Sequence, residues 1–214
     1  MPPAAAQPES MVPLQSWLSP QELCWGEALP AQRRGQYWRS RAALRRLLAV
    51  ELRLGPLQVP LHSPPGQAPQ LLDGQGSVSL SHARGATLIG WAPRPIGVDL
   101  EAGDRRFDAR ALMQRFFLPA EQQQLAPLAA EPLRRAVLRS WLAKEAAIKW
   151  RRRSLAAELA AWDFDHQRGL LRHAGDGTAL RPCEGAVQGW CWAAVVEDPE
   201  PALPAPLTWH FDCG

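Results

Sequence analysis

The segment IGVDLE (residues 96–101) alternates apolar and polar side chains and predicts the strand around which the rest of the chain is organised. Because successive side chains of a strand point to opposite faces, Asp99 and Glu101 share one face while Val98 and Leu100 face the core. Two carboxylates on one face repel each other unless a cation lies between them, and Mg²⁺ is a hard cation that takes oxygen ligands. An edge strand with a solvated acidic face is the competing interpretation.

The segment LRRAVLRSWLAKEAAIKW (residues 133–150) predicts a long helix, which Pro132 is well placed to open. Trp141, Glu145 and Lys149 are each four residues apart and therefore line one helix face. Glu145 is a candidate third metal ligand, and Lys149 is a candidate phosphate contact. An ordinary surface Glu–Lys pair is the alternative, but a tryptophan on the same face favours partial burial, where charged groups need partners.

Lysine is used at only two positions, Lys144 and Lys149, among 24 Lys plus Arg residues. Coincidence is one explanation. The functional explanation is that these positions need a compact ammonium group, for which a planar guanidinium would not substitute. Lys144 points about 100° away from Glu145 around the helix and therefore has a different role or none.

The remaining pattern predicts an α+β chain in two halves that join near residues 95–99. Each half has one long helix and a few strands. The predicted elements are a helix from Glu27 to about Arg53, a loop over 61–76, strands at 77–81 and 86–91, a short helix over 108–117 ended at Pro119, and a strand over 187–196.

Ser81 and His82 are adjacent at the end of a predicted strand, so they point to opposite faces and cannot form a nucleophile–base pair with each other. They are candidates to contact a phosphate, although a lone histidine is more often structural. The first helix is rich in arginine, as expected for a solvated basic face or for contacts to several phosphates: Arg33, Arg34, Arg39, Arg41, Arg45 and Arg46. Arg151–Arg153 could receive an acidic partner.

Bulk composition is that of a globular protein, with 214 residues, 46% hydrophobic and 21% charged. We expect a disordered tail over residues 1–13, no secretory signal and no membrane span. Four scattered cysteines without a C-x-x-C pair favour the reducing cytoplasm. A net charge of +3 is too small to argue for nucleic acid.

Taken in order, SLSHARG, PIGVDLE, RFFLPAEQQQL and SWLAKEAAIKW resemble the Sfp-type 4′-phosphopantetheinyl transferases. The resemblance runs from about Leu14 to Val196. It implies a fold of two similar α/β halves related by a pseudo-two-fold axis, with the active site between them. We therefore expect an N-terminal half on the coenzyme A side (14–95) and a C-terminal half with the metal site and the carrier-protein side (96–214).

The resemblance implies transfer of 4′-phosphopantetheine from coenzyme A to a serine of an apo acyl or peptidyl carrier protein, with release of adenosine 3′,5′-bisphosphate. Asp99, Glu101 and Glu145 would hold Mg²⁺, and Lys149 and His82 would neutralise the pyrophosphate. Glu145, directly or through a metal-bound water, would take the serine proton. The other residues implied on the coenzyme A side are Ser81, Arg34, Arg41 and Arg45. A monomer without nucleic-acid or membrane partners is expected.

Two departures from the family pattern are visible. The loop before the Ser-His strand, Pro65–Pro69, lacks the lysine of a Gly-Lys-Pro sequence, and residues 152–155 replace a Gly-[Lys/Arg]-Gly-Leu turn in the carrier-docking loop. A non-catalytic basic module that binds nucleic acid or coenzyme A is the alternative function. The carboxylates count against it, because without metal they would repel phosphate.

Overall fold

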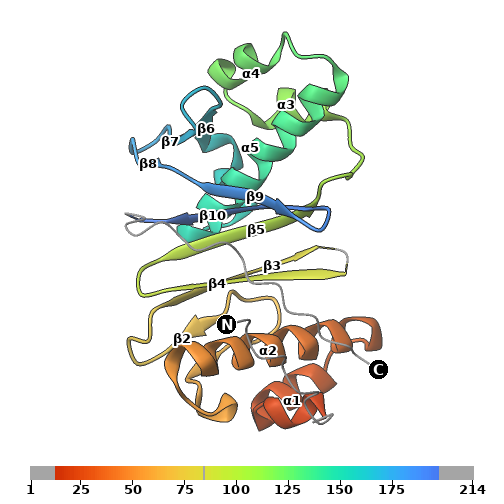
Figure 1. The fold of residues 1–214 in the computed structure, drawn as a ribbon, viewed down its shortest axis with the longest axis vertical. Coiled ribbons are helices and arrows are strands. Elements are labelled where there is room, and N and C mark those ends of the chain that lie inside the picture. Colours follow the sequence, from red (N-terminus) through yellow and green to blue (C-terminus); the bar gives the residue numbers. More distant parts are fainter. Residues whose placement is uncertain (1–12, 84, 198–214) are drawn as a thin grey trace, which may run out of the picture.

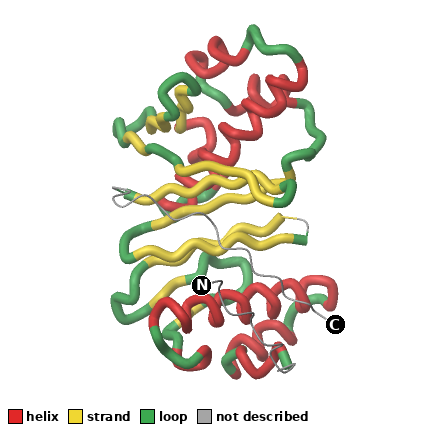
Figure 2. The backbone as a smooth tube through the Cα atoms, viewed as in Figure 1, coloured by secondary structure: helices red, strands yellow, loops and turns green. Residues whose placement is uncertain are grey.

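The computed structural model describes residues 13–83 and 85–197 as a stack of helical and sheet layers (Figures 1 and 2). Helices α1 and α2 form one end and are followed by the hairpin β3–β4, the sheet β5–β10–β9 and helix α5 (Figure 1). Helices α3 and α4 lie at the other end, and the small sheet β6–β7–β8 lies beside α5. The mixed α+β class predicted from the sequence is thus confirmed.

In the N-terminal half the helices precede the strands. The elements are η1 (Leu14–Trp17), α1 (Pro20–Glu27), α2 (Ala31–Leu52), η2 (Pro56–Gln58), β1 (Leu61–His62), β2 (Gln70–Leu71), β3 (Ser77–Ala83) and β4 (Ala86–Ala92). Helix α2 packs on the β3–β4 hairpin through a buried apolar cluster that includes Leu44, Leu48 and Val78. This packing fixes the hairpin, which carries Ser81 and His82.

The second half begins with the predicted strand. Its elements are β5 (Ile96–Ala102), α3 (Ala109–Phe116), α4 (Pro119–Leu125), α5 (Ala130–Trp150), α6 (Leu155–Glu158), η3 (Leu159–Ala161), β6 (Trp162–Asp165), β7 (Leu170–His173), β8 (Ala179–Leu180), β9 (Cys183–Val187) and β10 (Trp190–Val196). Strand β10 pairs antiparallel with both β5 and β9. Strand β5 therefore lies at one edge of this sheet, next to β3.

Strand β5 uses its two faces as the alternation predicts. Val98 and Leu100 are buried in the cluster between the sheet and the hairpin. On the other face, helix α5 approaches so closely at Gly97 that a Cβ atom there would lie 1.9 Å from the carbonyl oxygen of Ala146 and 2.4 Å from the amide nitrogen of Trp150. Glycine is therefore required where the last turns of α5 cross β5.

Serine side chains join β3 to the edge of β5. The backbone N–H of Val98 donates to Ser79 Oγ (3.1 Å), and that of Leu100 donates to Ser81 Oγ (3.2 Å). Both hydroxyls are buried, so they satisfy edge N–H groups that would otherwise lack a partner. This connection brings the hairpin and the sheet of the second half together at Asp99.

Several predicted boundaries were wrong for identifiable reasons. The helix expected from Glu27 to about Arg53 is α2 and begins only at Ala31, directly after Pro30, whereas α1 before it was not predicted. The short helix expected over 108–117 is found as α3, but Pro119 also opens the further helix α4 at its first position, where the missing N–H costs nothing. The strand expected over 187–196 is β10 and begins only at Trp190, because Gln188 and Gly189 both adopt positive φ (49° and 83°) and form a two-residue turn after β9.

Other predictions stay open. The pseudo-two-fold relation between the halves and the boundary at 95/96 remain predictions. The tail expected over residues 1–13 lies outside the described residues except for Pro13. Within the described residues, no helix combines the length and the apolar character needed to cross a membrane.

Candidate active site

Asp99 lies at the point where three elements meet. Its Oδ1 atom is 2.6 Å from Lys149 Nζ on α5 and accepts a 2.6 Å hydrogen bond from Ser81 Oγ on β3. The Asp99 carboxylate is buried, whereas the lysine side chain is 30% exposed. The ammonium group thus contacts a buried anion and still faces solvent, as a group that binds an anionic ligand requires.

Glu145 lies one helical turn before Lys149 and is partly buried. Burial, followed by the negative charge of Asp99, raises the pKa of its carboxyl to about 7, although Lys149 and a hydrogen bond from Trp141 act in the opposite direction. Glu101 also contributes to the upward shift. The three predicted carboxylates are therefore electrostatic neighbours, and Glu145 can exchange a proton near neutral pH.

Glu101 has a cationic partner of its own. Its Oε2 atom forms a short ion pair with Arg105, and its Oε1 atom accepts a hydrogen bond from the Ala102 N–H (3.1 Å). The loop after β5 is fixed by Arg134 of α5, which donates to the carbonyl oxygens of Gly103 (2.9 Å) and Arg105 (3.2 Å). The Glu101 carboxylate therefore contacts this loop in the structure.

The predicted metal ligands do not converge on one point in this structure. Within residues 13–83 and 85–197, no group of three His, Cys, Asp or Glu side chains is arranged to hold a metal ion. The physical reason is that Asp99 and Glu101 are each paired with a cation, Lys149 and Arg105. The three predicted ligands nevertheless suit a hard cation, since all are carboxylates. The negative charges of Asp99 and Glu101 also raise the pKa of Glu145, so the three carboxylates repel one another.

His82 lies at the exposed end of β3, on the opposite face from Ser81. Its Nδ1 atom is 3.0 Å from Thr87 Oγ1. Desolvation lowers the pKa of the imidazole, and the positive charges of Arg41 and Lys149 lower it further. The two cations act on one imidazole, so Arg41 and Lys149 form a positive region around His82, beside the carboxylates.

Arg41 is the arginine of α2 that faces this region. It is buried, donates to the Ser63 carbonyl oxygen (3.1 Å) and to Ser40 Oγ (3.0 Å), and lies 4.6 Å from the centre of the Tyr37 ring. Arg34 is placed differently, because its Nη2 donates to the carbonyl oxygens of Glu27 (3.2 Å) and Leu29 (3.4 Å). Arg41 is the better placed of the two to act together with His82.

Two of the predicted coenzyme A contacts serve the fold instead. Arg45 is buried, pairs with the buried Glu22 at 2.6 Å, and donates to the carbonyl oxygens of Pro56 (2.9 Å) and Val59 (3.1 Å). Ser81 uses its hydroxyl on Asp99 and on the Leu100 N–H. Neither side chain is open to a ligand in this structure, so Ser81 positions Asp99 and Arg45 ties α2 to α1.

The two lysines have separate roles. Lys144 is fully buried, lies 2.6 Å from Glu121 of α4 and sits 3.8 Å from the centre of the Phe117 ring. Burial lowers the pKa of this lysine and raises the pKa of Glu121, which also accepts a hydrogen bond from the Phe164 N–H (3.2 Å). Lys144 is thus a packing residue, and the different role expected for it is structural.

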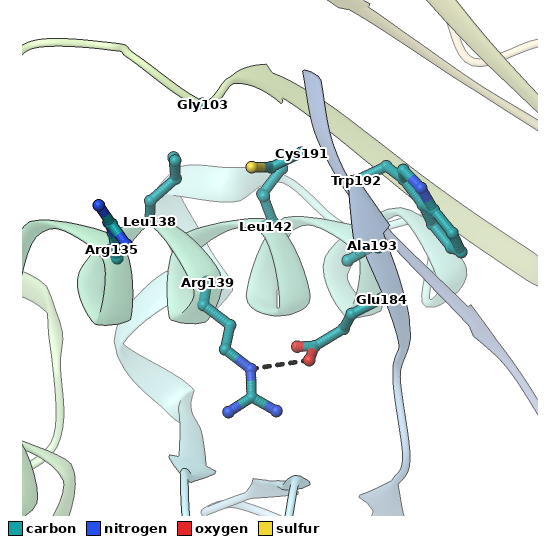
Figure 3. A pocket seen from close by; sticks show the side chains of 10 residues that line it. Gly103, Arg135, Leu138, Arg139, Leu142, Glu184, Cys191, Trp192 and Ala193 are labelled. Atoms are coloured by element: carbon teal, nitrogen blue, oxygen red, sulfur yellow. Dashed lines mark hydrogen bonds and ion pairs between the residues drawn. The ribbon is translucent and has the colours of Figure 1, made fainter. Parts of the chain in front are cut away.

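Two cavities lie away from these residues. The first, of about 380 Å³, lies between α5 and the strands β9 and β10, with the Arg139–Glu184 ion pair (2.7 Å) at its rim (Figure 3). The second, of about 370 Å³, is lined by Trp150, Arg151 and Arg152 among others. None of the predicted metal, catalytic or coenzyme A residues lines either cavity, so the site rests on the side-chain contacts around Asp99.

Sequence reasoning missed Arg105 and Glu121. Arg105 is four residues after Glu101, but that spacing signals an ion pair only in a helix, and these residues lie in a strand and a loop. Glu121 belongs to a helix that was not predicted. No pattern in the sequence connected it to Lys144.

Comparisons with known proteins identify the family. The family description "4′-phosphopantetheinyl transferase superfamily" matches residues 95–202, half of the chain, which include Asp99, Glu101, Glu145 and Lys149. A protein of Synechocystis sp. provisionally named a 4′-phosphopantetheinyl transferase is 34% identical over 140 residues, which is 63% of this chain and 57% of that relative. The match thus spans less than two thirds of the relative's length. On the family match and the site that lies within it, the chain belongs to the 4′-phosphopantetheinyl transferase superfamily.

Proposed function

We propose that this protein transfers the 4′-phosphopantetheine group of coenzyme A to a serine of an apo acyl or peptidyl carrier protein. The observation that carries the proposal is the ion pair of Asp99 with the partly exposed Lys149, together with the charge interactions of both with Glu145. All three residues lie within the family match. Carboxylates beside a lysine and an imidazole suit a polyphosphate that arrives with a divalent cation.

The positive region would receive the pyrophosphate of coenzyme A. Lys149 supports this role because its ammonium pairs with Asp99 while its side chain is 30% exposed. His82 donates or accepts at its ring nitrogens from the exposed strand end, and Arg41 adds a fixed positive charge behind it. These groups stabilise the charge that develops on the phosphoryl oxygens in the transition state.

The carboxylate side of the site would hold Mg²⁺ through Asp99, Glu101 and Glu145, once Lys149 and Arg105 release the first two. When bound, this ion would neutralise the pyrophosphate oxygens and polarise the phosphorus. The donor chemistry supports the assignment, because Mg²⁺ is bound in proteins by a few carboxylates together with substrate phosphate.

Glu145 is the proposed base. It takes the proton of the acceptor serine as the serine oxygen bonds to the β-phosphorus of coenzyme A. The bond between that phosphorus and the bridging oxygen breaks, and adenosine 3′,5′-bisphosphate leaves with the electron pair. Support comes from the charge interactions of Glu145 with Asp99 and Lys149 and from a pKa of about 7, near the value at which a general base works best.

The natural partners would be coenzyme A and an acidic carrier protein, with the chain acting as a cytoplasmic monomer of the holo-[acyl-carrier-protein] synthase type in fatty acid or polyketide biosynthesis. The run Arg151–Arg153, directly after α5, is the proposed contact for the carrier's acidic surface. Arg151 already pairs with Asp176, so Arg152 and Arg153 are the members expected to meet the partner.

A nucleic-acid-binding module is the weaker alternative. Such a module would need the arginines of α2 to form a solvated face. Arg41 and Arg45 of that helix are instead buried and engaged in internal contacts. A binding module would also show a steep salt dependence of affinity and no requirement for Asp99.

The test is incubation with an apo carrier protein, coenzyme A and Mg²⁺, followed by mass spectrometry of the carrier. We expect one phosphopantetheine group on a serine, no transfer in EDTA, and no transfer by Asp99→Asn. Absence of any transfer across a panel of acyl and peptidyl carriers would refute the proposed function.

A further inference from the structure

We propose that Arg105 is a built-in counter-cation that holds Glu101 until a divalent metal ion takes its place. The proposal rests on the metal site assigned under the proposed function and adds a residue that the sequence motifs do not contain. It also explains why three neighbouring carboxylates fail to converge in this structure.

The contact is direct and leaves Glu101 with little free capacity. One carboxylate oxygen pairs with the Arg105 guanidinium, and the other accepts the Ala102 N–H (3.1 Å). The Glu101 side chain is 23% exposed and that of Arg105 is 40% exposed. Solvent and dissolved ions therefore reach the pair, so a metal ion can compete for the carboxylate without the core opening.

The loop that carries Arg105 is held in place, so the pairing does not depend on chance encounters of a long side chain. Arg134 of α5 donates to the carbonyl oxygens of Gly103 and of Arg105 itself. The Gly103 N–H donates to the Gly189 carbonyl oxygen (2.8 Å) in the turn between β9 and β10. Two flanking elements thus fix the backbone from which Arg105 returns to Glu101.

Charge is distributed unevenly over the three carboxylates. Asp99 pairs with Lys149 and Glu101 pairs with Arg105, whereas Glu145 makes no ion pair with any residue that the structure describes. Two internal cations thus occupy the places where a metal would contact the strand. Binding of a metal ion by Glu101 requires the Arg105 guanidinium to leave. The free energy of the lost ion pair therefore weakens the binding of the metal.

The experiment measures binding of Mn²⁺, as a probe for Mg²⁺, by the loss of the free-ion electron paramagnetic resonance signal. Wild type and Arg105→Ala are titrated with and without coenzyme A at one pH and ionic strength. The matched control is Arg106→Ala, which removes the same charge from the next position, where the exposed guanidinium has no ion pair with the described residues.

We expect Arg105→Ala to lower the Mn²⁺ dissociation constant about three- to fivefold, the size that an exposed ion pair allows, and Arg106→Ala to change it less than about twofold. Equal dissociation constants for the two variants, or weaker binding by Arg105→Ala, would overturn the role of Arg105 and leave the transferase assignment intact. Absence of Mn²⁺ binding by all three proteins would contradict the metal site itself. Thermal unfolding of each variant shows that the loop change leaves the fold in place.

Discussion

Lys149 Nζ lies 2.6 Å from Asp99 Oδ1, although the two residues are separated by most of helix α5 and the α3–α4 region. The ion pair forms because Gly97 lets the last turns of α5 touch the backbone of β5. The same Asp99 oxygen accepts the Ser81 hydroxyl, so its two partners come from opposite halves of the molecule. A substitution that alters the size or shape of the side chain at Gly97, Ser81 or Lys149 should therefore reduce turnover even where the net charge is kept.

Replacing Lys149 with arginine tests this directly. The guanidinium keeps the charge but is larger and planar, so it cannot contact Asp99 and a phosphate oxygen from the same point. We expect the kcat of carrier modification to fall at least about tenfold, less than the roughly 10²–10³ that loss of a whole preorganised donor costs, because the charge is kept. Arg172→Lys, an exposed exchange on β7, is the control and should leave kcat unchanged. Near-normal turnover by Lys149→Arg would contradict the proposed role.

Gly97→Ala should separate α5 from β5. The added methyl group would overlap backbone atoms of Ala146 and Trp150, which cannot move as a side chain can. We expect a loss of about 1–3 kcal/mol in the free energy of unfolding, together with lower activity, because Lys149 moves away from Asp99. Gly35→Ala in α2 is the control, since its methyl group meets only the flexible end of Arg39. Urea denaturation of both variants gives the comparison.

Ser79 and Ser81 of β3 can be compared to distinguish a role in stability from a role in positioning Asp99. Ser79→Ala and Ser81→Ala each leave one buried N–H of β5 without its acceptor, at a cost of about 1–3 kcal/mol. Only Ser81 also donates to Asp99. We therefore expect Ser81→Ala to lose at least as much stability as Ser79→Ala, and a clear loss of kcat for Ser81→Ala alone. Equal kcat values would show that the Ser81 hydroxyl does not position the carboxylate.

The sequence was informative where one local pattern sufficed. Alternation in residues 96–101 predicts β5 and the shared face of Asp99 and Glu101, and four-residue spacing predicts the shared face of Glu145 and Lys149. The adjacent Ser81 and His82 were predicted on opposite faces, and the structure places them so.

Contacts between elements that are distant in the sequence escaped this reasoning. The pairing of Arg45 with Glu22 depends on how α1 lies against α2, and the pairing of Glu101 with Arg105 depends on a loop held by α5. Both arginines look like ordinary surface charges in the sequence. Tertiary packing decides whether such a charge meets a ligand or the protein itself.

Glu145→Gln should stabilise the protein in the absence of metal while abolishing transfer. Burial raises the pKa of Glu145 to about 7, so the folded state binds a proton that the unfolded state has already lost, and stability falls as pH rises from about 4.5 to 7. Glutamine removes this penalty. In EDTA at pH 8 we expect a Tm higher by roughly 2–4 °C, equivalent to about 1 kcal/mol for a chain of this size. The gain should shrink at pH 5, and a gain independent of pH would contradict the explanation.

The buried pair of Lys144 and Glu121 should behave differently from Lys149 and Asp99. Removing one partner leaves an unpaired charge in the core, so Lys144→Met and Glu121→Gln should each cost about 3–5 kcal/mol. The double variant should lose much less than the sum of the two, because no buried charge remains. Denaturant unfolding of the four proteins measures this coupling. Additive losses would show that the two side chains act independently. Under conditions in which Lys144→Met is folded, it should keep normal kcat, since no contact links Lys144 to Asp99. Lys149→Arg, in contrast, should fold normally and lose activity.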